Sequence, residues 1–131
     1  MIEAKEKELI DRYLAAYNAF DIDAMLAQLD PDIRFENYSG GQLTADASGI
    51  EEFRRLAEQS KDLFSEREQR VTSLARRVTQ TGATLVAEIA WRGRIAADIP
   101  GGPPAGTLLE MSGRSEFDFG GSGITKIVDR S

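Results

Sequence analysis

The chain has 131 residues, of which 41% are hydrophobic and 29% are charged, and its net charge is −6 at pH 7. This length and balance predict one globular domain over residues 1–131, long enough to bury a core. The sequence contains neither Cys nor His, which excludes disulfides, thiolate nucleophiles, a Ser-His-Asp triad and zinc held by His or Cys. The N-terminus has no apolar signal core and no segment is apolar enough to span a bilayer, so we expect a cytoplasmic protein without a membrane partner.

The acidic balance also disfavours a nucleic-acid partner, because proteins that bind nucleic acids usually present a basic patch. The arginines cluster only locally, in the pairs Arg54-Arg55 and Arg76-Arg77. Charge pairs of this kind are more typical of solvated faces. We therefore expect no nucleic-acid partner.

Helical periodicity predicts two helices at the start of the chain. The apolar residues of the first recur at three- and four-residue steps: Leu9, Ile10, Tyr13, Leu14 and Tyr17. Asp21 is a suitable N-cap for a second helix over residues 22–29. Asp30 and Pro31 end this helix, because the residue before a proline is pushed out of the helical region.

A short strand, a polar loop and a third helix are predicted next. Residues 33–38 have strand character, and residues 39–49 are small and polar. Ser48 and Glu51 have the spacing of a Ser-x-x-Glu capping box. This box predicts a third helix that runs to about Lys61.

The apolar period then changes from helical spacing to two. Residues 67–79 alternate imperfectly, which predicts a bulge, and a hairpin turn is predicted at residues 80–82. In segments 85–96 and 108–119 the odd positions are apolar and the even positions carry every charge. A proline-rich loop separates these segments, and a glycine-rich turn at 120–123 leads into a last strand over 124–129. Glycines within the strands, Gly93 and Gly113, fit curvature or a bulge.

This element order predicts an α+β fold. Long strands with one apolar face need a cover, and the N-terminal helices supply it. We expect a strongly curved, antiparallel sheet whose open side is covered by these helices, with a pocket inside.

Three stretches carry a resemblance to a known family. They are residues 11–23 (DRYLAAYNAFDID), residues 35–37 (FEN) with 49–53 (GIEEF), and residues 91–93 (WRG) with the loop 101–106 and residues 117–119 (FDF). In order and spacing they resemble the nuclear transport factor 2-like superfamily, and within it the SnoaL-like and ketosteroid-isomerase-like proteins. The resemblance implies a cone-shaped, cystatin-like α+β roll and a homodimer formed through the outer face of the sheet.

The same resemblance assigns roles to three positions. Tyr13 lies where the isomerase places its oxyanion-binding tyrosine; the alternative is an ordinary core residue. Asn37 lies at the position of the general-base carboxylate. Ser115 lies where the isomerase and the SnoaL-like cyclases carry a functional aspartate. Since Asn and Ser cannot move protons at neutral pH, we expect a pocket without a carboxylate, and neither steroid isomerisation nor aldol-type cyclisation.

The predicted ligand-binding residues combine aromatic and aliphatic side chains with a few polar ones. They are Tyr13, Tyr17, Phe35, Asn37, Phe53, Ile89, Trp91, Met111, Ser115 and Phe117. Tyr13 and Asn37 are also the catalytic candidates. Glu36 and Glu88 are reserve acid/base candidates, although the alternation places them on the outer face of the sheet.

Three functions remain open at this point. The favoured one is binding of a small hydrophobic or aromatic molecule in the cone. The first alternative is a SnoaL-like enzyme, an isomerase, cyclase/lyase or hydrolase, that polarises a carbonyl or hydroxyl group with Tyr13. The second is a non-catalytic dimerisation module with a filled cone. We expect no metal and no cofactor, since neither glycine-rich segment leads into a helix as a phosphate-binding loop does.

Overall fold

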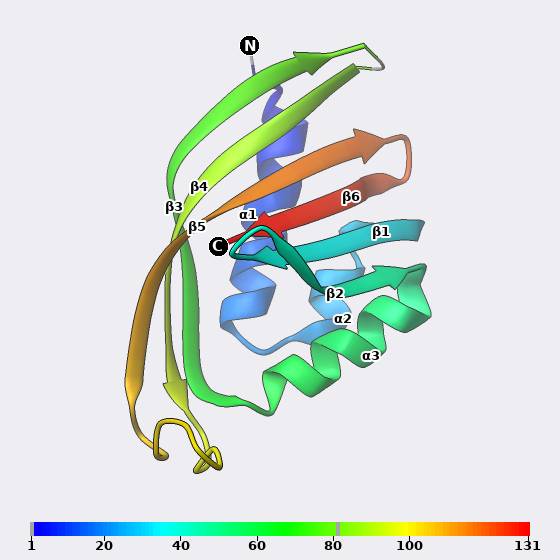
Figure 1. Cartoon of the computed structure of the whole chain (residues 1–131). Coiled ribbons are helices and arrows are strands. Elements are labelled where there is room, and N and C mark those ends of the chain that lie inside the picture. The colour runs from blue at the N-terminus through cyan, green and yellow to red at the C-terminus, as the bar shows by residue number, and fades with distance from the viewer. Residues whose placement is uncertain (1, 81) are drawn as a thin grey trace.

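A curved six-stranded sheet with helices on its concave side makes up the protein (Figure 1). The computed structural model describes residues 2–80 and 82–131. In chain order the elements are α1 (Ala4–Asn18), α2 (Ile22–Leu26), β1 (Leu29–Ser39), β2 (Gln42–Ser48), α3 (Ile50–Lys61), β3 (Phe64–Thr79), β4 (Gly82–Ile95), β5 (Leu108–Gly120) and β6 (Gly123–Arg130). The predicted α+β class with a curved sheet covered by helices is confirmed.

The strand order across the sheet is β2-β1-β6-β5-β4-β3. Neighbouring strands run antiparallel as predicted, with the exception of β1 and β6, which are parallel. Figure 1 shows that β3, β4 and β5 bend strongly, so that their lower halves stand away from α3. This bend leaves room between the sheet and the helices.

The hydrophobic core lies between the helices and the concave face of the sheet. The predicted alternation in β4 and β5 is confirmed, because Leu85, Ala87 and Phe117 are at most 1% exposed. Ile10 of α1 and Ile127 of β6 are buried equally deeply. None of the helices within residues 2–80 and 82–131 is long and apolar enough to cross a membrane.

The bulge predicted in β3 is also confirmed. Its register with β4 shifts between Val71 and Ser73. An extra residue in one strand increases the local twist, which agrees with the strong bend of this strand. The predicted turn at 80–82 includes Thr81, which lies outside the described residues.

The segment 39–49 is not a loop as predicted, because it contains β2. This strand pairs with β1 and forms one edge of the sheet, and most of its side chains are exposed. Only Ala47 is buried, so no apolar alternation marks the strand in the sequence.

Two predicted helix boundaries also move. The N-cap of α3 is Gly49 rather than Ser48, and Glu52 Oε1 accepts a hydrogen bond from the Ser48 backbone nitrogen at 2.9 Å. The second helix ends at Leu26, and β1 already contains Pro31. This proline is tolerated because the pairing of β1 with β2 begins only at Arg34.

Candidate functional site

A cavity of about 400 Å³ lies on the concave side of the sheet, beneath α1 and α3. All the residues predicted to bind a ligand line this cavity except Phe117. Phe117 is fully buried and packs edge-on against Tyr13, with ring centroids 6.3 Å apart. Phe117 therefore packs behind Tyr13 in the core and does not face the cavity. The alternative of a filled cone does not agree with an open space of this size.

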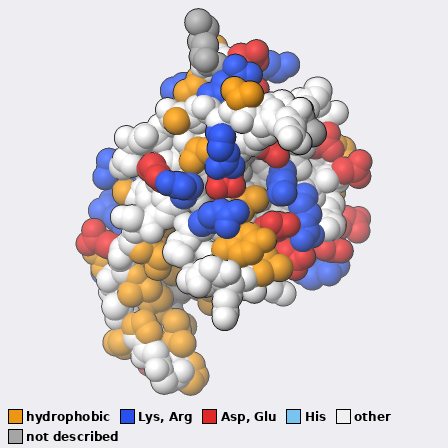
Figure 2. Space-filling view, turned by 45° about the horizontal axis from the view of Figure 1, so that its top comes forward, with side chains coloured by type: hydrophobic (Ala, Val, Ile, Leu, Met, Phe, Trp, Pro, Cys, Tyr) orange, Lys and Arg blue, Asp and Glu red, His pale blue; other side chains and the backbone are white. Residues whose placement is uncertain are grey.

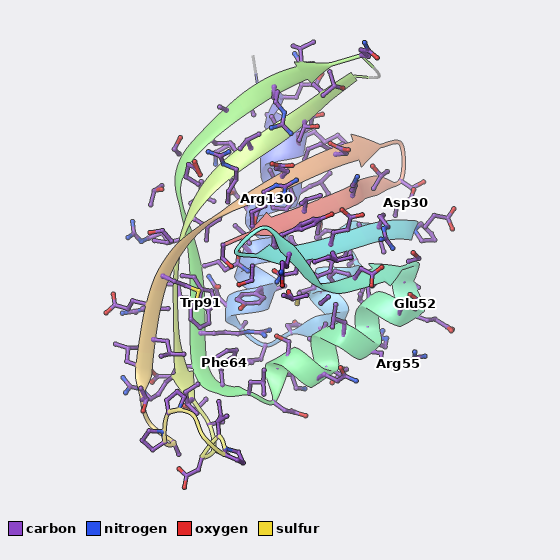
Figure 3. All side chains as sticks on the ribbon, in the orientation of Figure 1. Asp30, Glu52, Arg55, Phe64, Trp91 and Arg130 are labelled. Carbon is purple, nitrogen blue, oxygen red and sulfur yellow. The ribbon has the colours of Figure 1, made fainter. Side chains whose placement is uncertain are left out.

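Trp91 on β4 is the largest side chain of the cavity wall. Its indole nitrogen donates to the Tyr17 hydroxyl at 2.9 Å, and its ring meets the Phe64 ring edge-on at 5.2 Å. Gly93 makes room for it, because a Cβ there would stand 2.6 Å from the indole ring. Figure 3 shows Trp91 and Phe64 in the space between the bent strands and α3. Gly93 therefore leaves space for the Trp91 ring, in addition to the strand curvature that the sequence predicted for it.

The cavity contains a carboxylate, so the expectation of a carboxylate-free pocket is wrong. Strand β6 runs between β1 and β5, and Asp129 is in register with Asn37 on one side and Ser115 on the other. Residues in register on adjacent strands point to the same face, about 5 Å apart. All three line the cavity. The carboxylate of Asp129 therefore lies beside both Asn37 and Ser115. These are the two positions at which the family carries a functional carboxylate and this chain does not.

The surroundings of Asp129 bring the pKa of its carboxyl group close to neutral pH. Ser115 Oγ donates to Asp129 Oδ1 at 2.6 Å. Burial raises the pKa of Asp129 to about 6, and the hydrogen bond from Ser115 opposes this rise. A carboxylate with such a pKa is ionised at pH 7 and still binds a proton more readily than an exposed one, as a general base requires.

Tyr13 on α1 is 5% exposed and contributes a phenol to the cavity. Its pKa is raised, first by burial and then by the negative charge of Asp129. The phenol therefore stays protonated. The pKa of Tyr13 shows no effect of a side-chain hydrogen bond within the described residues, so its hydroxyl is available to donate to a bound molecule.

Asn37 on β1 has less freedom than the resemblance implied. Its side-chain nitrogen donates to Thr44 Oγ1 at 2.8 Å, and the Thr44 hydroxyl lies 3.2 Å from the Asn37 backbone oxygen. The amide is thus tied to β2, and its oxygen is the group left for a ligand.

The reserve candidates Glu36 and Glu88 do not line the cavity. The Tyr38 hydroxyl donates to Glu36 at 3.0 Å and lowers the pKa of Glu36. Arg114 pairs with Glu88 at 2.9 Å and lowers the pKa of Glu88. Both carboxylates are therefore kept ionised away from the cavity, and a role as base there does not fit their positions.

Charged side chains also cover much of the remaining surface. Figure 2 shows acidic and basic groups interspersed, while apolar groups gather on the protruding end at the lower left. Ile99, within the loop between β4 and β5, is 40% exposed, and Leu108, the first residue of β5, is 43% exposed.

The homodimer that the resemblance implies, formed through the outer face of the sheet, stays a prediction.

The sequence analysis did not name several residues of the cavity wall, and the charged residues Asp129 and Arg67 are the most consequential of them. For Asp129 a signal existed, because it lies two residues after the buried Ile127 and so on the same face of its strand. For Arg67 there was none, since the bulged strand β3 has no regular alternation.

Most of the chain matches one known protein family. Residues 10–128 match the model of the SnoaL-like domain. The chain belongs to the SnoaL-like family. This match begins within α1, at Ile10, and ends within β6, at Val128. No curated protein matches this SnoaL-like domain.

Solved structures similar to the SnoaL-like domain share its fold. A candidate polyketide cyclase from Xanthomonas campestris pv. campestris has a TM-score of 0.78 at 23% identity, covering 97% of this chain and 90% of that one. A candidate SnoaL-like polyketide cyclase from Jannaschia sp. CCS1 has a TM-score of 0.77 at 17% identity, with coverages of 98% and 85%. AclR, a candidate hydroxylase from Streptomyces galilaeus, has a TM-score of 0.72 at 19% identity, with coverages of 96% and 87%. At these identities the likeness shows the fold alone.

Proposed function

We propose that this SnoaL-like domain binds a small hydrophobic or aromatic molecule in the cavity beneath its helices. The observation that carries the proposal is the cavity itself, whose volume of about 400 Å³ falls in the range of small-molecule sites. Its wall combines aromatic and aliphatic side chains, which can pack against a ligand, with polar and charged side chains that can orient it. The candidate polyketide cyclases among the similar structures support polyketides as one class of ligand to test.

Native mass spectrometry of freshly purified protein tests whether such a molecule is retained. A thermal-shift screen with steroids, polyketides and aromatic acids extends the test. A ligand present at 100 times its Kd stabilises the fold by about 2.7 kcal/mol. Binding is also visible directly, because Trp91 is the only tryptophan of the chain and lines the cavity. Absence of any retained or stabilising molecule contradicts the proposal.

Replacing Tyr13 by Phe is expected to weaken this stabilisation. The variant removes the phenol hydroxyl and leaves the ring, so the loss should equal one hydrogen bond, about 0.5–1.5 kcal/mol. Tyr38→Phe is the matched control, because its hydroxyl bonds Glu36 outside the cavity. Ligand stabilisation that is equal in Tyr13→Phe and wild type would assign Tyr13 to packing.

A second function, proton transfer to and from a bound carbonyl compound, is favoured by Asp129. In such a reaction the carboxylate takes a proton from the carbon next to the carbonyl, and the C–H electron pair moves into the carbonyl to form an enolate. The Tyr13 phenol donates a hydrogen bond to the enolate oxygen. Returning the proton to the same or another carbon completes an exchange or an isomerisation.

Exchange of the α-protons of 2-tetralone in D₂O, followed by proton NMR, tests this second function. Asp129→Asn should slow the protein-dependent exchange by roughly 100-fold or more, which is the contribution of a positioned general base. Glu88→Gln is the control, because its carboxylate does not line the cavity, and its rate should equal that of wild type. Equal rates for wild type and Asp129→Asn would reject proton transfer by this residue.

A further inference from the structure

We infer that the molecule bound in the cavity carries an anionic oxygen, such as a carboxylate, and that Arg67 binds this oxygen. The inference rests on the proposed binding function and adds the chemical class of the ligand. It is carried by a guanidinium group that is buried in the cavity wall and lacks a counter-charge.

Arg67 on β3 is held rigidly in place at the end of α1. Its guanidinium carbon lies over two aromatic rings, 3.8 Å from the centroid of Tyr17 and 4.5 Å from that of Phe20. Its Nε donates to the Tyr17 backbone oxygen at 2.8 Å. Phe20 has a positive φ of 59°, a conformation that only glycine adopts without cost. The stack therefore fixes the plane of the guanidinium group before any ligand arrives.

The charge of Arg67 is not neutralised by the protein. The residue is 6% exposed, and the ion pairs of the described residues do not include it. Its Nη2 is a buried donor without a hydrogen-bond partner in the described part of the chain. Burial lowers the pKa of Arg67, although a guanidinium stays protonated in proteins. A buried charge left unpaired is costly, and an anionic acceptor would remove the cost.

The carboxylate in the same cavity does not supply the missing partner. Asp129 accepts its hydrogen bond from Ser115 and forms no ion pair with Arg67 in the described structure. The negative charge of Asp129 raises the pKa of Tyr13 and Tyr17, and the positive charge of Arg67 lowers both. The two tyrosines are thus close to both charges. A ligand that spans them can place its anionic oxygen at Arg67 and its carbon skeleton toward Asp129.

The form of the donor group favours a planar anion. A guanidinium presents its N–H groups in a fixed fork that matches a carboxylate in two parallel hydrogen bonds. One nitrogen of Arg67 is already used by the backbone of α1, which leaves the Nη atoms for a ligand. The aromatic rings of the cavity wall would pack against an apolar body attached to that carboxylate.

Two probes of the same shape test the inference, 2-naphthoate and 2-naphthamide. Their affinities are measured by titration of Trp91 fluorescence. Wild type should bind the acid roughly 10-fold or more tightly than the amide, because a hydrogen bond to a charged group is worth that much. Arg67→Met should abolish the preference while leaving the Kd of the amide within about 2-fold. The matched control is Arg70→Met, an exposed arginine on the same strand, which should keep the full preference.

The outcomes separate this inference from the proposed function. Equal affinity of wild type for the two probes, or an unchanged preference in Arg67→Met, overturns the inference and leaves the binding function intact. Absence of binding by both probes overturns the inference as well, whereas failure of the whole screening panel is what overturns the binding function. Should Arg67→Met not fold, Arg67→Lys replaces it: the lysine keeps the charge without the fork, so its preference should lie between 1 and that of wild type.

Discussion

At about pH 7.5 the variant Asp129→Asn is expected to be more stable than wild type by about 3 kcal/mol, even though it removes the candidate base. The reason is that burial raises the pKa of Asp129 from 3.8 to about 6. Each unit of difference between folded and unfolded pKa corresponds to about 1.4 kcal/mol. An asparagine keeps the shape of the side chain and can still accept the hydrogen bond from Ser115, but it carries no charge to bury.

The gain depends on pH in a defined direction. Between about pH 4 and pH 6 the folded chain binds more protons at Asp129 than the unfolded chain does, so the free energy of unfolding of wild type falls as the pH rises through this window. Above it the full cost of the buried charge is present. Below about pH 4 the carboxyl is neutral in both states, and the two proteins should be equally stable.

Urea unfolding at several pH values, followed by Trp91 fluorescence, measures this difference. Comparing variant with wild type cancels the opposite contributions of Glu36 and Glu88, whose pKa values are lowered in the folded chain. Asp32→Asn, at an exposed position of β1, is the control and should change stability by less than about 0.5 kcal/mol. A variant Asp129→Asn that is less stable than wild type near pH 7.5 would show that the charge is compensated. A natural chain that retains a destabilising carboxylate in its cavity fits a functional role for this group.

The fold could be predicted from the sequence because its strongest signals are long. The alternation in β4 and β5 covers a whole strand in each case, and one buried face on a strand fixes its register. The edge strand β2 was missed for the opposite reason. Most of its side chains are exposed and only Ala47 is buried, so only its partner strand identifies it.

The cavity wall was predictable to a similar extent, but its charged groups were not. The resemblance assigned the family's carboxylates to the positions of Asn37 and Ser115. Because each position was considered alone, the sequence predicted a cavity without a carboxylate. The register of the sheet changes this inference, because it places Asp129 between these two residues on the neighbouring strand. Whether β6 lies beside β1 or at an edge is a property of topology, and no local pattern in the sequence carries it.

Arg67 illustrates a second limit. On a strand with a bulge, the parity of a position no longer tells which face it occupies. An arginine next to Glu66 and Glu68 also looks like one member of a solvated charged run. Only the three-dimensional contact with Tyr17 and Phe20 shows that this one is buried.

Truncation of Phe117 to Ala is expected to cost about 3–5 kcal/mol of stability, the range for a large aromatic residue in a packed core. Phe117 has no exposed surface and supports the Tyr13 ring from β5. Domains of this size are stable by only about 5–15 kcal/mol, so the variant should unfold at much lower urea concentration. Phe117→Leu preserves most of the volume and should cost about half as much or less.

Met111→Ala, on the same strand, provides the contrast that separates core from cavity. Met111 lines the cavity and is 49% exposed, so its truncation creates no new void and should change stability by less than about 0.5 kcal/mol. The same variant should weaken binding of 2-naphthamide, since it removes apolar surface from the site. If Met111→Ala were as destabilising as Phe117→Ala, the space beside it would be part of a packed core. The cavity on which the binding proposal depends would then be closed in solution.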